Sequence, residues 1–498
     1  MINKRNLCIY MFEFFSSANY RRCIWMQSIN TFLFALVIFT LLIIPYKATY
    51  AQSDSTLTLS RMFDQVKLFH PIARQAQLQP DMANAELFKT KGAFDPVVST
   101  GLDQKQFADK SYYSLLDGGV KWATGIGAVV KSGYEFNRGL FLNPENNTPS
   151  NGLLYAGISM PLGQGLIIDD RRAALRSARI GTEIAEQKKR EILNQLLYNA
   201  SEHYFEWFRS YHIRSVFNNA FRNANERYRA VVLNSLSGDR PAIDTIEAKI
   251  QLQIIEAGLN QSILEFNNSV LLFSSFFWDT ENKPVGLSTA LKPLNINDIA
   301  LQDEVTRILI SDTDFRENHP YMLQLRQKLR QLEIDRKLKQ DRLKPVLNVQ
   351  FNPLTEPTGD GLLTNFSVNN FKWGLEFRMP LLLRKERGDI RLAEFKIQEN
   401  QLETENLSIN LLNIFDSRIN EWTALREQAE IYAAAADNYE RMFNAENRLF
   451  EIGESSLFLV NAREQALINA RIKYIEVLAK SIKAYYSILY YAGQLADL

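Results

Sequence analysis

Apolar residues recur at every seventh position through much of the second half of the chain. The series is Phe415, Trp422, Ala429, Ala436, Phe443 and Phe450, and a companion row three positions further on contains Leu425, Tyr432 and Tyr439. Two rows with this spacing predict the seam of a coiled coil. A looser series in the first half keeps the same step in Leu193, Ala200, Trp207, Phe221 and Tyr228, and Arg214 interrupts it.

Two stretches predict helices much longer than those of globular proteins. Residues 169–235 contain no proline and one glycine, Gly181, and residues 384–450 are interrupted only by Gly388. At 1.5 Å per residue, each helix would extend on the order of 100 Å. Short turns that contain glycine lead from them to further helices at 242–278 and 457–494. Each pair of helices is therefore expected to fold back as an antiparallel hairpin.

Residues 93–165 and 344–383 predict strands. They alternate polar and apolar side chains and contain many aromatic ones, including Tyr112, Trp122, Tyr155, Trp373 and Phe377. The pattern is typical of an outer-membrane barrel, and it also fits a soluble sheet with an aromatic core. No later apolar stretch is long enough for a membrane helix, so a membrane crossing would have to use strands. One chain offers too few strands to close a barrel, so this interpretation requires a cyclic oligomer.

The chain contains an internal two-fold repeat. His70-Pro71 lies 26 positions before Pro96, and His319-Pro320 lies 26 positions before Pro345. Glu206-Trp207 and Glu421-Trp422 each precede a turn glycine, Gly238 or Gly453, by 31 positions. Each repeat is expected to run from a helix through strands to two long helices. We assign the first repeat to residues 52–278, a linker to residues 279–314 and the second repeat to residues 315–498.

The first 51 residues predict a secretory signal. The uncharged run Ser28–Pro45 follows Arg21 and Arg22, and Ala51 precedes a polar stretch, so cleavage after Ala51 is expected. Translation from Met11 or Met26, or a retained membrane anchor, are the alternatives. Both cysteines, Cys8 and Cys23, lie in this leader. It also holds five of the 57 basic and one of the 56 acidic side chains, which leaves a net charge of −3 and no indication of nucleic-acid binding.

Residues for enzyme chemistry are not found in any recognisable pattern. The four histidines are His70, His203, His212 and His319, and none belongs to a His-Glu-x-x-His run. His70 and His319 precede proline at equivalent places in the repeats, which favours a role at helix starts. His203 and His212 are interpreted as tunnel-wall or surface residues. We expect no catalytic, cofactor or metal site, and hence no enzyme.

These features resemble the TolC-like outer-membrane efflux proteins. The resemblance covers nearly all of the chain after the leader. It depends on the paired His-Pro segments, the strand ends Met160-Pro161-Leu162-Gly163-Gln164-Gly165 and Met379-Pro380-Leu381, and the turn around Gly453. The first strand region is about 30 residues longer than the second, the first turn reads Gly-Asp-Arg-Pro, and the lipid-anchor cysteine of some members is absent.

The resemblance implies a mainly α protein with a membrane β region. It implies an elongated homotrimer with a tunnel of antiparallel coiled-coil hairpins and a shared transmembrane β-barrel, to which each copy gives four strands. Such a protein sits in the outer membrane of a Gram-negative bacterium, reaches through the periplasm, and passively conducts substrates of a tripartite efflux or type I secretion system.

The resemblance also implies partners, a periplasmic adaptor and an inner-membrane pump. The turns expected to dock the adaptor are Gly238-Asp239-Arg240 and Gly453-Glu454-Ser455. We further hypothesise that Asp239, Glu451 and Glu454 hold or line the closed end of the tunnel, unless they are merely solvated helix-end charges. An adaptor-like or scaffold protein, anchored by an uncleaved helix at residues 28–45, is the alternative function.

Overall fold

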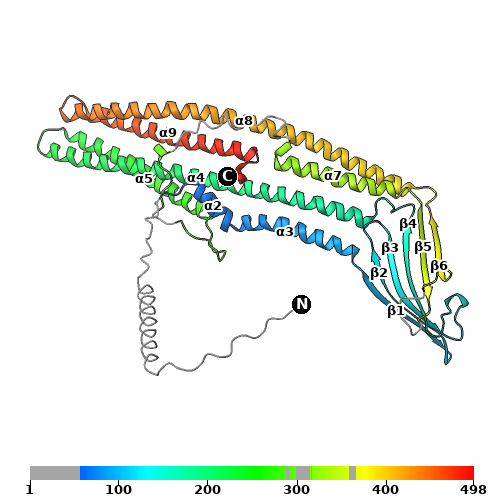
Figure 1. Ribbon diagram of the computed structural model, residues 1–498. Coiled ribbons are helices and arrows are strands. Elements are labelled where there is room, and N and C mark those ends of the chain that lie inside the picture. The colour runs from blue at the N-terminus through cyan, green and yellow to red at the C-terminus, as the bar shows by residue number, and fades with distance from the viewer. Residues whose placement is uncertain (1–55, 288–290, 299–314, 316, 358–365) are drawn as a thin grey trace, which may run out of the picture. The chain divides into compact units, whose positions relative to one another are not determined.

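The computed structural model describes residues 56–287, 291–298, 315, 317–357 and 366–498 of the chain (Figure 1). The chain divides into residues 1–55 and a unit Thr56–Leu498, and the description below concerns that unit. The expected leader and its cleavage site lie outside the described residues. No helix in the described part of the chain is apolar enough over a sufficient length to span a bilayer.

Short helices begin each repeat at the His-Pro pairs. Helix α2 (Leu59–Phe69) precedes α3 (Pro71–Lys91) in the first repeat, and in the second repeat α7 (Pro320–Asp341) follows the helical residues 315, 317 and 318. His70 and His319 are the N-cap residues, and their Nδ1 atoms accept the backbone N–H of Ile72 and Tyr321, each at 3.2 Å. Proline follows at the first helical position, where its missing N–H costs no helical hydrogen bond. This confirms that both histidines act at helix starts.

Four long helices form two antiparallel hairpins. Helix α4 (Asp170–Leu236) turns back into α5 (Ala242–Ser274), and α8 (Arg384–Glu451) turns back into α9 (Leu457–Tyr491). The two longest contain 67 and 68 residues, which gives each a length of about 100 Å. Asp169 caps α4 by accepting the backbone N–H of Arg172 at 2.8 Å. Helix α5 ends at Ser274, because Phe276 and Phe277 turn into the core instead of continuing it.

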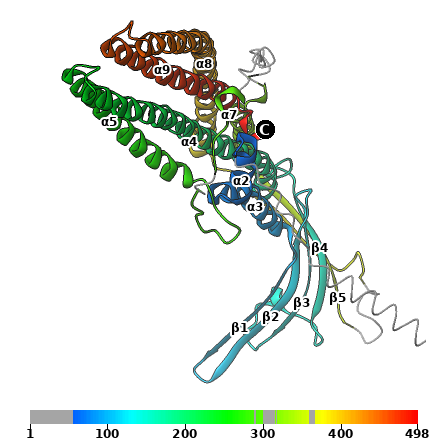
Figure 2. The ribbon, with the colours of Figure 1, turned by 90° about the vertical axis from the view of Figure 1, so that its left-hand side faces the viewer.

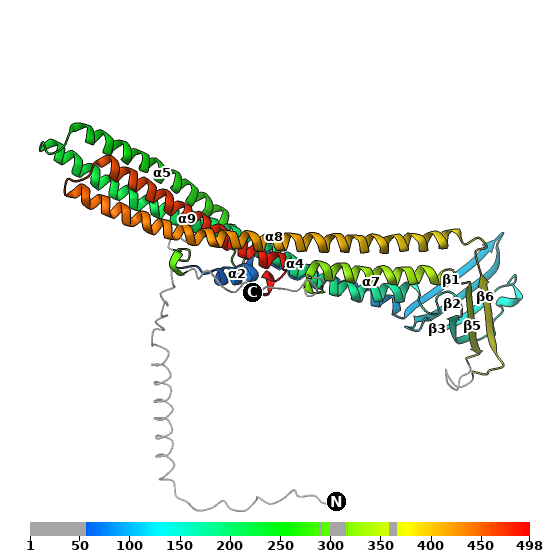
Figure 3. The ribbon, with the colours of Figure 1, turned by 90° about the horizontal axis from the view of Figure 1, so that it is seen from above.

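The helices lie side by side in a fixed order. Nearest the sheet the order is α3, α4, α7, α8, and nearer the tip turns it is α5, α4, α9, α8 (Figure 1). Figure 3 shows α8 continuing from the tip turns to the sheet. The heptad residues of α8 form the seam, since Phe415, Trp422, Ala429, Ala436 and Phe450 are buried. The largest core, around Tyr204, Trp207 and Phe273, lies where the two repeats meet.

The six strands found among the described residues form one antiparallel sheet in chain order. They are β1 (Val97–Phe107), β2 (Lys110–Ala123), β3 (Val129–Arg138), β4 (Leu153–Pro161), β5 (Val346–Thr355) and β6 (Phe371–Arg378). The sheet therefore has two strands more than the four per copy that the resemblance implied for the barrel. The first repeat has an additional hairpin, because Ala108 and Asp109 both adopt positive φ (51° and 55°) and close a two-residue turn.

Helices at one end and a curved antiparallel sheet at the other make up the unit (Figures 1 and 2). This confirms a mainly α protein with a β region. Short 3₁₀ turns connect the elements at Gly92–Phe94, Pro144–Asn146, Ile296–Asp298 and Leu495–Asp497.

Candidate functional site

The two faces of the sheet differ sharply in polarity. Residues that pair across strands share a face, and the pairing registers place most large apolar side chains on one face and most charged ones on the other. One face, called here the apolar face, carries Val98, Leu102, Leu116, Val120, Trp122, Val130, Phe136, Leu154, Ile158, Val349, Phe351, Trp373, Leu375 and Phe377. The other, the polar face, carries Asp103, Lys105, Asp117, Lys121, Lys131, Glu135, Asn348, Gln350, Lys372, Glu376 and Arg378.

The apolar face is uncovered within the described chain. Val98, Trp373 and Phe377 have exposed fractions of 78%, 63% and 66%. A soluble sheet domain would bury such a face in a core, since large apolar surfaces are costly in water. Alternation between an apolar outer band and a polar inner surface is the arrangement of strands that cross a bilayer.

Glycines on the polar face make room for side chains that lie along the sheet. Tyr155 donates a hydrogen bond to Asp117 Oδ1 at 3.2 Å, across Gly133 and Gly119. A Cβ atom on Gly133 would lie 2.5 Å from the Tyr155 hydroxyl oxygen, so a larger residue cannot replace it without moving the tyrosine. Tyr155 therefore lies along the sheet, over Gly133 and Gly119, instead of projecting away from it.

Both edges of the sheet are open. Among the described residues, no strand pairs with the outer edge of β1 or of β6. Unpaired N–H and C=O groups at a strand edge cannot face hydrocarbon, and in water they invite pairing with another chain. Within the described residues the sheet therefore ends in two edges that are free to pair with further strands.

The junction between helices and sheet is held by buried polar contacts. Asp341, at the end of α7, accepts the backbone N–H of Gly165 at 2.6 Å and the ammonium group of Lys344 at 2.5 Å. Arg172, near the start of α4, donates to the carbonyl oxygens of Gly165 and Leu166. These contacts connect the Met-Pro-Leu-Gly-Gln-Gly strand end to both repeats.

The two tip turns have the same backbone geometry. Gly238 and Gly453 have φ of +84° and +82°, and the next residue donates its N–H to a carbonyl five positions back. These bonds join Asp239 to Asn234 and Glu454 to Leu449, both at 2.9 Å. This is the Schellman arrangement, which ends a helix at a glycine in the left-handed region. The predicted turn residues thus lie at the far ends of the hairpins from the sheet (Figure 1).

Arg240 connects the two tips. Its guanidinium lies 3.9 Å from the centre of the Phe450 ring, in α8, and 3.7 Å from Asp244 Oδ2, in its own hairpin. Beneath it, the four long helices share a small core of Val231, Ala248, Phe450, Leu457 and Val460. The structure therefore brings Arg240 to the opposite tip, whereas Gly238 and Gly453 act through backbone conformation alone.

The three carboxylates proposed for the closed end are exposed at the tips. Asp239 accepts from the Ser237 hydroxyl at 3.0 Å, and Glu451 accepts from the Asn447 amide at 3.0 Å. Glu454 follows the turn glycine and is also exposed. Ser455 turns away from the tip and donates to Glu446.

Sequence reasoning missed a buried ion pair below the tips. Arg227 of α4 pairs with Glu464 of α9, and the Glu464 side chain is only 3% exposed. Burial raises the pKa of the Glu464 carboxyl, and Arg227 acts against that rise. The residues are 237 positions apart, and the sequence offered no signal that aligns them.

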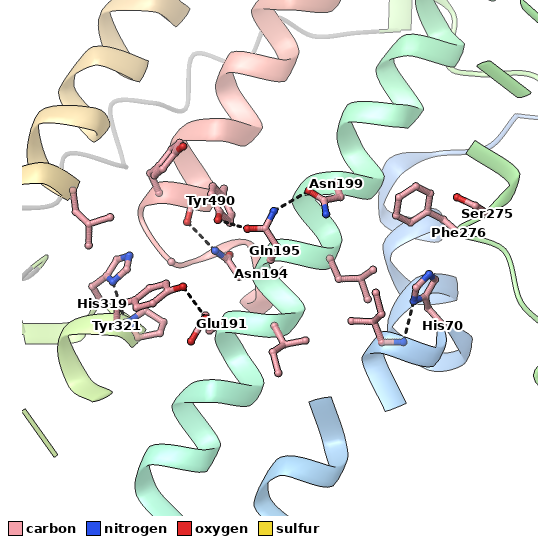
Figure 4. A pocket seen from close by; sticks show the side chains of 17 residues that line it. His70, Glu191, Asn194, Gln195, Asn199, Ser275, Phe276, His319, Tyr321 and Tyr490 are labelled. Atoms are coloured by element: carbon pink, nitrogen blue, oxygen red, sulfur yellow. Dashed lines mark hydrogen bonds between the residues drawn. The ribbon is translucent and has the colours of Figure 1, made fainter. Parts of the chain in front are cut away.

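Sequence reasoning also missed a cavity of about 500 Å³ where the two repeats meet (Figure 4). His70 and His319 lie on opposite sides of it, with Glu191 between them in the wall. Glu191 accepts from the Tyr321 hydroxyl at 2.7 Å and from the Gln324 amide at 2.8 Å. Burial acts to raise the pKa of Glu191, but these bonds and the contact with Lys188 outweigh it and lower the pKa.

The other two histidines do not line this cavity. His212 bonds through Nε2 to the carbonyl oxygen of Leu294, at 3.0 Å, and His203 lies beside the Phe276 ring. His212 thus attaches the segment between the repeats to α4, a role that the interpretation as a tunnel-wall residue did not include. In the part of the chain that the structure describes, no group of three or more His, Cys, Asp or Glu residues is placed to bind a metal ion.

Comparisons with known proteins agree with this geometry. Residues 313–494 match the model of the outer membrane efflux protein family. The crystal structure of the Campylobacter jejuni CmeC outer membrane channel is 14% identical, with a TM-score of 0.60, and the match covers 88% of this chain and 85% of that one. No curated protein matches the sequence.

Two further solved structures share the fold. The outer-membrane channel OprN is 13% identical with a TM-score of 0.63, and the match covers 88% of this chain and 90% of that one. The open state of the Neisseria gonorrhoeae MtrE outer membrane channel is 11% identical with a TM-score of 0.60, and it covers 88% of both chains.

Proposed function

We propose that this chain works as a passive outer-membrane duct. It belongs to the outer membrane efflux protein family through residues 313–494, and it shares the channel fold over most of its length. The observation that carries the proposal is the sheet. It has an exposed apolar face opposite a charged face, two open edges, and helices of about 100 Å that extend from one end. The apolar face would contact outer-membrane lipid, and the helices would extend into the periplasm.

The duct is proposed to be a homotrimer. The element orders give each copy two long edges, one made of β1, α3 and α5 and the other of β6 and α8. Both edges present unpartnered apolar side chains within the described chain. Those on α5 are Ile243, Ile246, Ile250 and Ile254, and those on α8 include Phe395, Leu402 and Ile409 at steps of seven. Joining unlike edges head to tail closes a ring.

We assign the partners from the family resemblance and the tips. A periplasmic adaptor is proposed to dock on the turns at Gly238-Asp239-Arg240 and Gly453-Glu454-Ser455, and an inner-membrane pump or secretion transporter would supply the energy. Arg240 supports this placement because its contact with Phe450 joins the two hairpins, so a movement of one tip is transmitted to the other. Opening then requires partner binding to favour a state in which the tips separate.

Cell fractionation followed by amino-terminal sequencing tests the proposal. The protein should be found in outer membranes as a heat-modifiable trimer that begins after Ala51, and the purified trimer should conduct ions across a planar bilayer with no energy source except the applied voltage. Recovery from inner membranes with residues 28–45 still attached would contradict the duct and support the anchored scaffold.

A further inference from the structure

The sheet of each copy contains six strands, whereas the family resemblance implied four. We propose that three copies close into an 18-stranded barrel, in which β1 of one copy pairs with β6 of the next and Asp103 lies opposite Lys372. The inference rests on the trimer of the proposed function, but it concerns which strands meet, in what register, and how wide the resulting pore is.

Strand direction permits this pairing. Strand β1 follows α3 and leaves the helical end of the sheet, and β6 returns to that end before α8 begins. The two edges are therefore antiparallel when copies stand side by side, like every other pair in the sheet. A closed antiparallel barrel with an even number of strands has no open edge left in the lipid.

The faces restrict the register. Polar-face residues have odd numbers on β1 and even numbers on β6, so only every second register keeps polar beside polar. One allowed register sets Asp103 opposite Lys372; a shift by two residues sets Lys372 opposite Lys105 or Gly101 instead. Opposite charges in directly opposed positions are favourable and like charges are not. In the same register the apolar face pairs Leu102 with Trp373 and Val98 with Phe377.

The stagger of the existing strands is suitable for closure. A row of opposed residues starts at Val97, the first residue of β1, passes through Lys121 and Lys131, and ends at Lys372. In the proposed register Val97 lies opposite Arg378, the last residue of β6, and Lys372 lies six residues before Arg378 on that strand. A slip of six residues in each six-stranded copy gives a strand tilt of about 35° in the closed barrel, within the range seen in membrane barrels.

The width that the helices of one copy occupy along the ring agrees with the width of six strands. Four packed helices at 8–10 Å spacing occupy about 32–40 Å along the ring. Six tilted strands occupy about 35 Å, but four would occupy only about 23 Å. A barrel of this size is about half as wide again as one of 12 strands and leaves an open aqueous lumen. The strands would then continue the helical wall at nearly constant width, so the barrel would not narrow the duct.

Cysteine cross-linking tests the register directly. In a background with Cys8 and Cys23 replaced by serine, the Asp103→Cys/Lys372→Cys variant should form covalent dimers and trimers on oxidation, because directly opposed Cβ atoms are within disulfide reach. The matched control Asp103→Cys/Glu376→Cys uses the same strands and face. Its cysteines would be about 13 Å apart along the strand, and it should stay uncoupled.

A different pattern of cross-links would contradict the 18-stranded barrel. If the β1–β2 hairpin stays out of the barrel, β3 becomes the closing strand, and Glu135→Cys/Lys372→Cys would cross-link while Asp103→Cys/Lys372→Cys does not. That result, with a native mass still that of a trimer, would overturn the 18-stranded barrel and leave the proposed duct intact. A monomeric native mass would instead overturn the duct itself.

Charge reversal provides a second test that needs no disulfide. Asp103→Lys and Lys372→Asp should each lower the temperature at which the trimer dissociates in detergent, and the double variant should recover most of the loss, because it restores the pair with its polarity exchanged. Additive losses in the double variant would contradict the proposed pairing.

Discussion

His319 and His70 hold equivalent helix starts with a neutral imidazole, because a protonated Nδ1 cannot accept the backbone N–H. Burial lowers the pKa of His319 from 6.5 to about 4, and burial also lowers the pKa of His70. Below pH 6.5 the His319 imidazole becomes protonated in the unfolded chain, whereas in the folded protein it stays neutral until about pH 4. Protons therefore favour unfolding in that range, and stability falls as the pH falls.

The first prediction follows from this difference. Acidification from pH 7 to about pH 4 should cost about 3 kcal/mol per copy through His319. His319→Asn keeps a capping oxygen and removes the titration, so the dissociation temperature of its trimer should fall less with pH than that of the wild type. Glu191, with its lowered pKa, stays ionised over most of this range in both proteins. Equal losses in both would show that His319 does not titrate as described.

The exposed carboxylates at the tips lead to a second prediction. If Asp239 and Glu454 from three copies line the closed end, Asp239→Ala and Glu454→Ala should reduce both the single-channel cation conductance and the cation selectivity, since like charges gathered in a constriction attract cations. Asp64→Ala, an exposed carboxylate on α2, is the control for a general loss of charge. Unchanged conductance and selectivity would exclude both tip residues from the gate.

Neighbouring residues of β6 provide the third prediction, at the scale of elements. Leu375 lies on the apolar face and Glu376 on the polar face. Leu375→Arg should cost about 2–4 kcal/mol and reduce the amount of trimer in outer membranes, because its charge would face lipid. Glu376→Arg should leave assembly nearly unchanged and shift ion selectivity toward anions. Similar assembly of both variants would contradict the assignment of the faces.

The end of α8 gives the fourth prediction. Gly453 has φ of +82° and open space around its Cβ position, and Gly388, within α8, has the same open space without positive φ. Gly453→Ala should therefore destabilise by about 1 kcal/mol, and Gly388→Ala should stabilise by about the same amount. Thermal dissociation of the two trimers measures both effects, and shifts of the same sign would refute the assignment of strain to backbone conformation.

The sequence predicted the long elements well because their periodicity extends over many turns. In the heptad row from Phe415 to Phe450 along α8, every member is buried except Phe443, which is partly buried. Arg214, which interrupts the heptad row of the first half, still packs against an apolar side chain, because its guanidinium lies 3.7 Å from the centre of the Phe266 ring. The strand count was not predictable, because the turn at Ala108-Asp109 lacks the glycine or asparagine that usually marks a two-residue hairpin.

Contacts between distant segments were beyond sequence reasoning for a different reason. The Arg227–Glu464 pair and the Glu191 cavity depend on the angular position of helices that are hundreds of residues apart. A heptad pattern gives the buried face of each helix but not which residues on neighbouring helices stand at the same height. The residues of the polar face of the sheet were likewise not predictable, since the strand registers decide which side chains lie side by side on it.

At the scale of the whole molecule, the two long edges of each copy make one continuous surface. Strand β1, α3 and α5 follow one another along one side, and β6 and α8 along the other. Because the order of strands parallels the order of helices, a neighbour that pairs with β1 is also placed against α3 and α5. Membrane and periplasmic parts are therefore expected to assemble together, with the periplasmic contacts made by apolar side chains.

The fifth prediction tests that periplasmic contact without touching the barrel. Ile250 is 51% exposed on α5, and Lys249 is its exposed neighbour away from the apolar row. Ile250→Glu should lower the dissociation temperature of the trimer, because each interface loses about 1.5–3 kcal/mol of apolar burial and takes on a desolvated carboxylate. Lys249→Glu also adds negative charge but should change little. Equal falls in dissociation temperature for the two variants would assign the effect to charge alone. A fall only for the Ile250 variant would place a second copy against α5, far from the strands where that copy also meets β1.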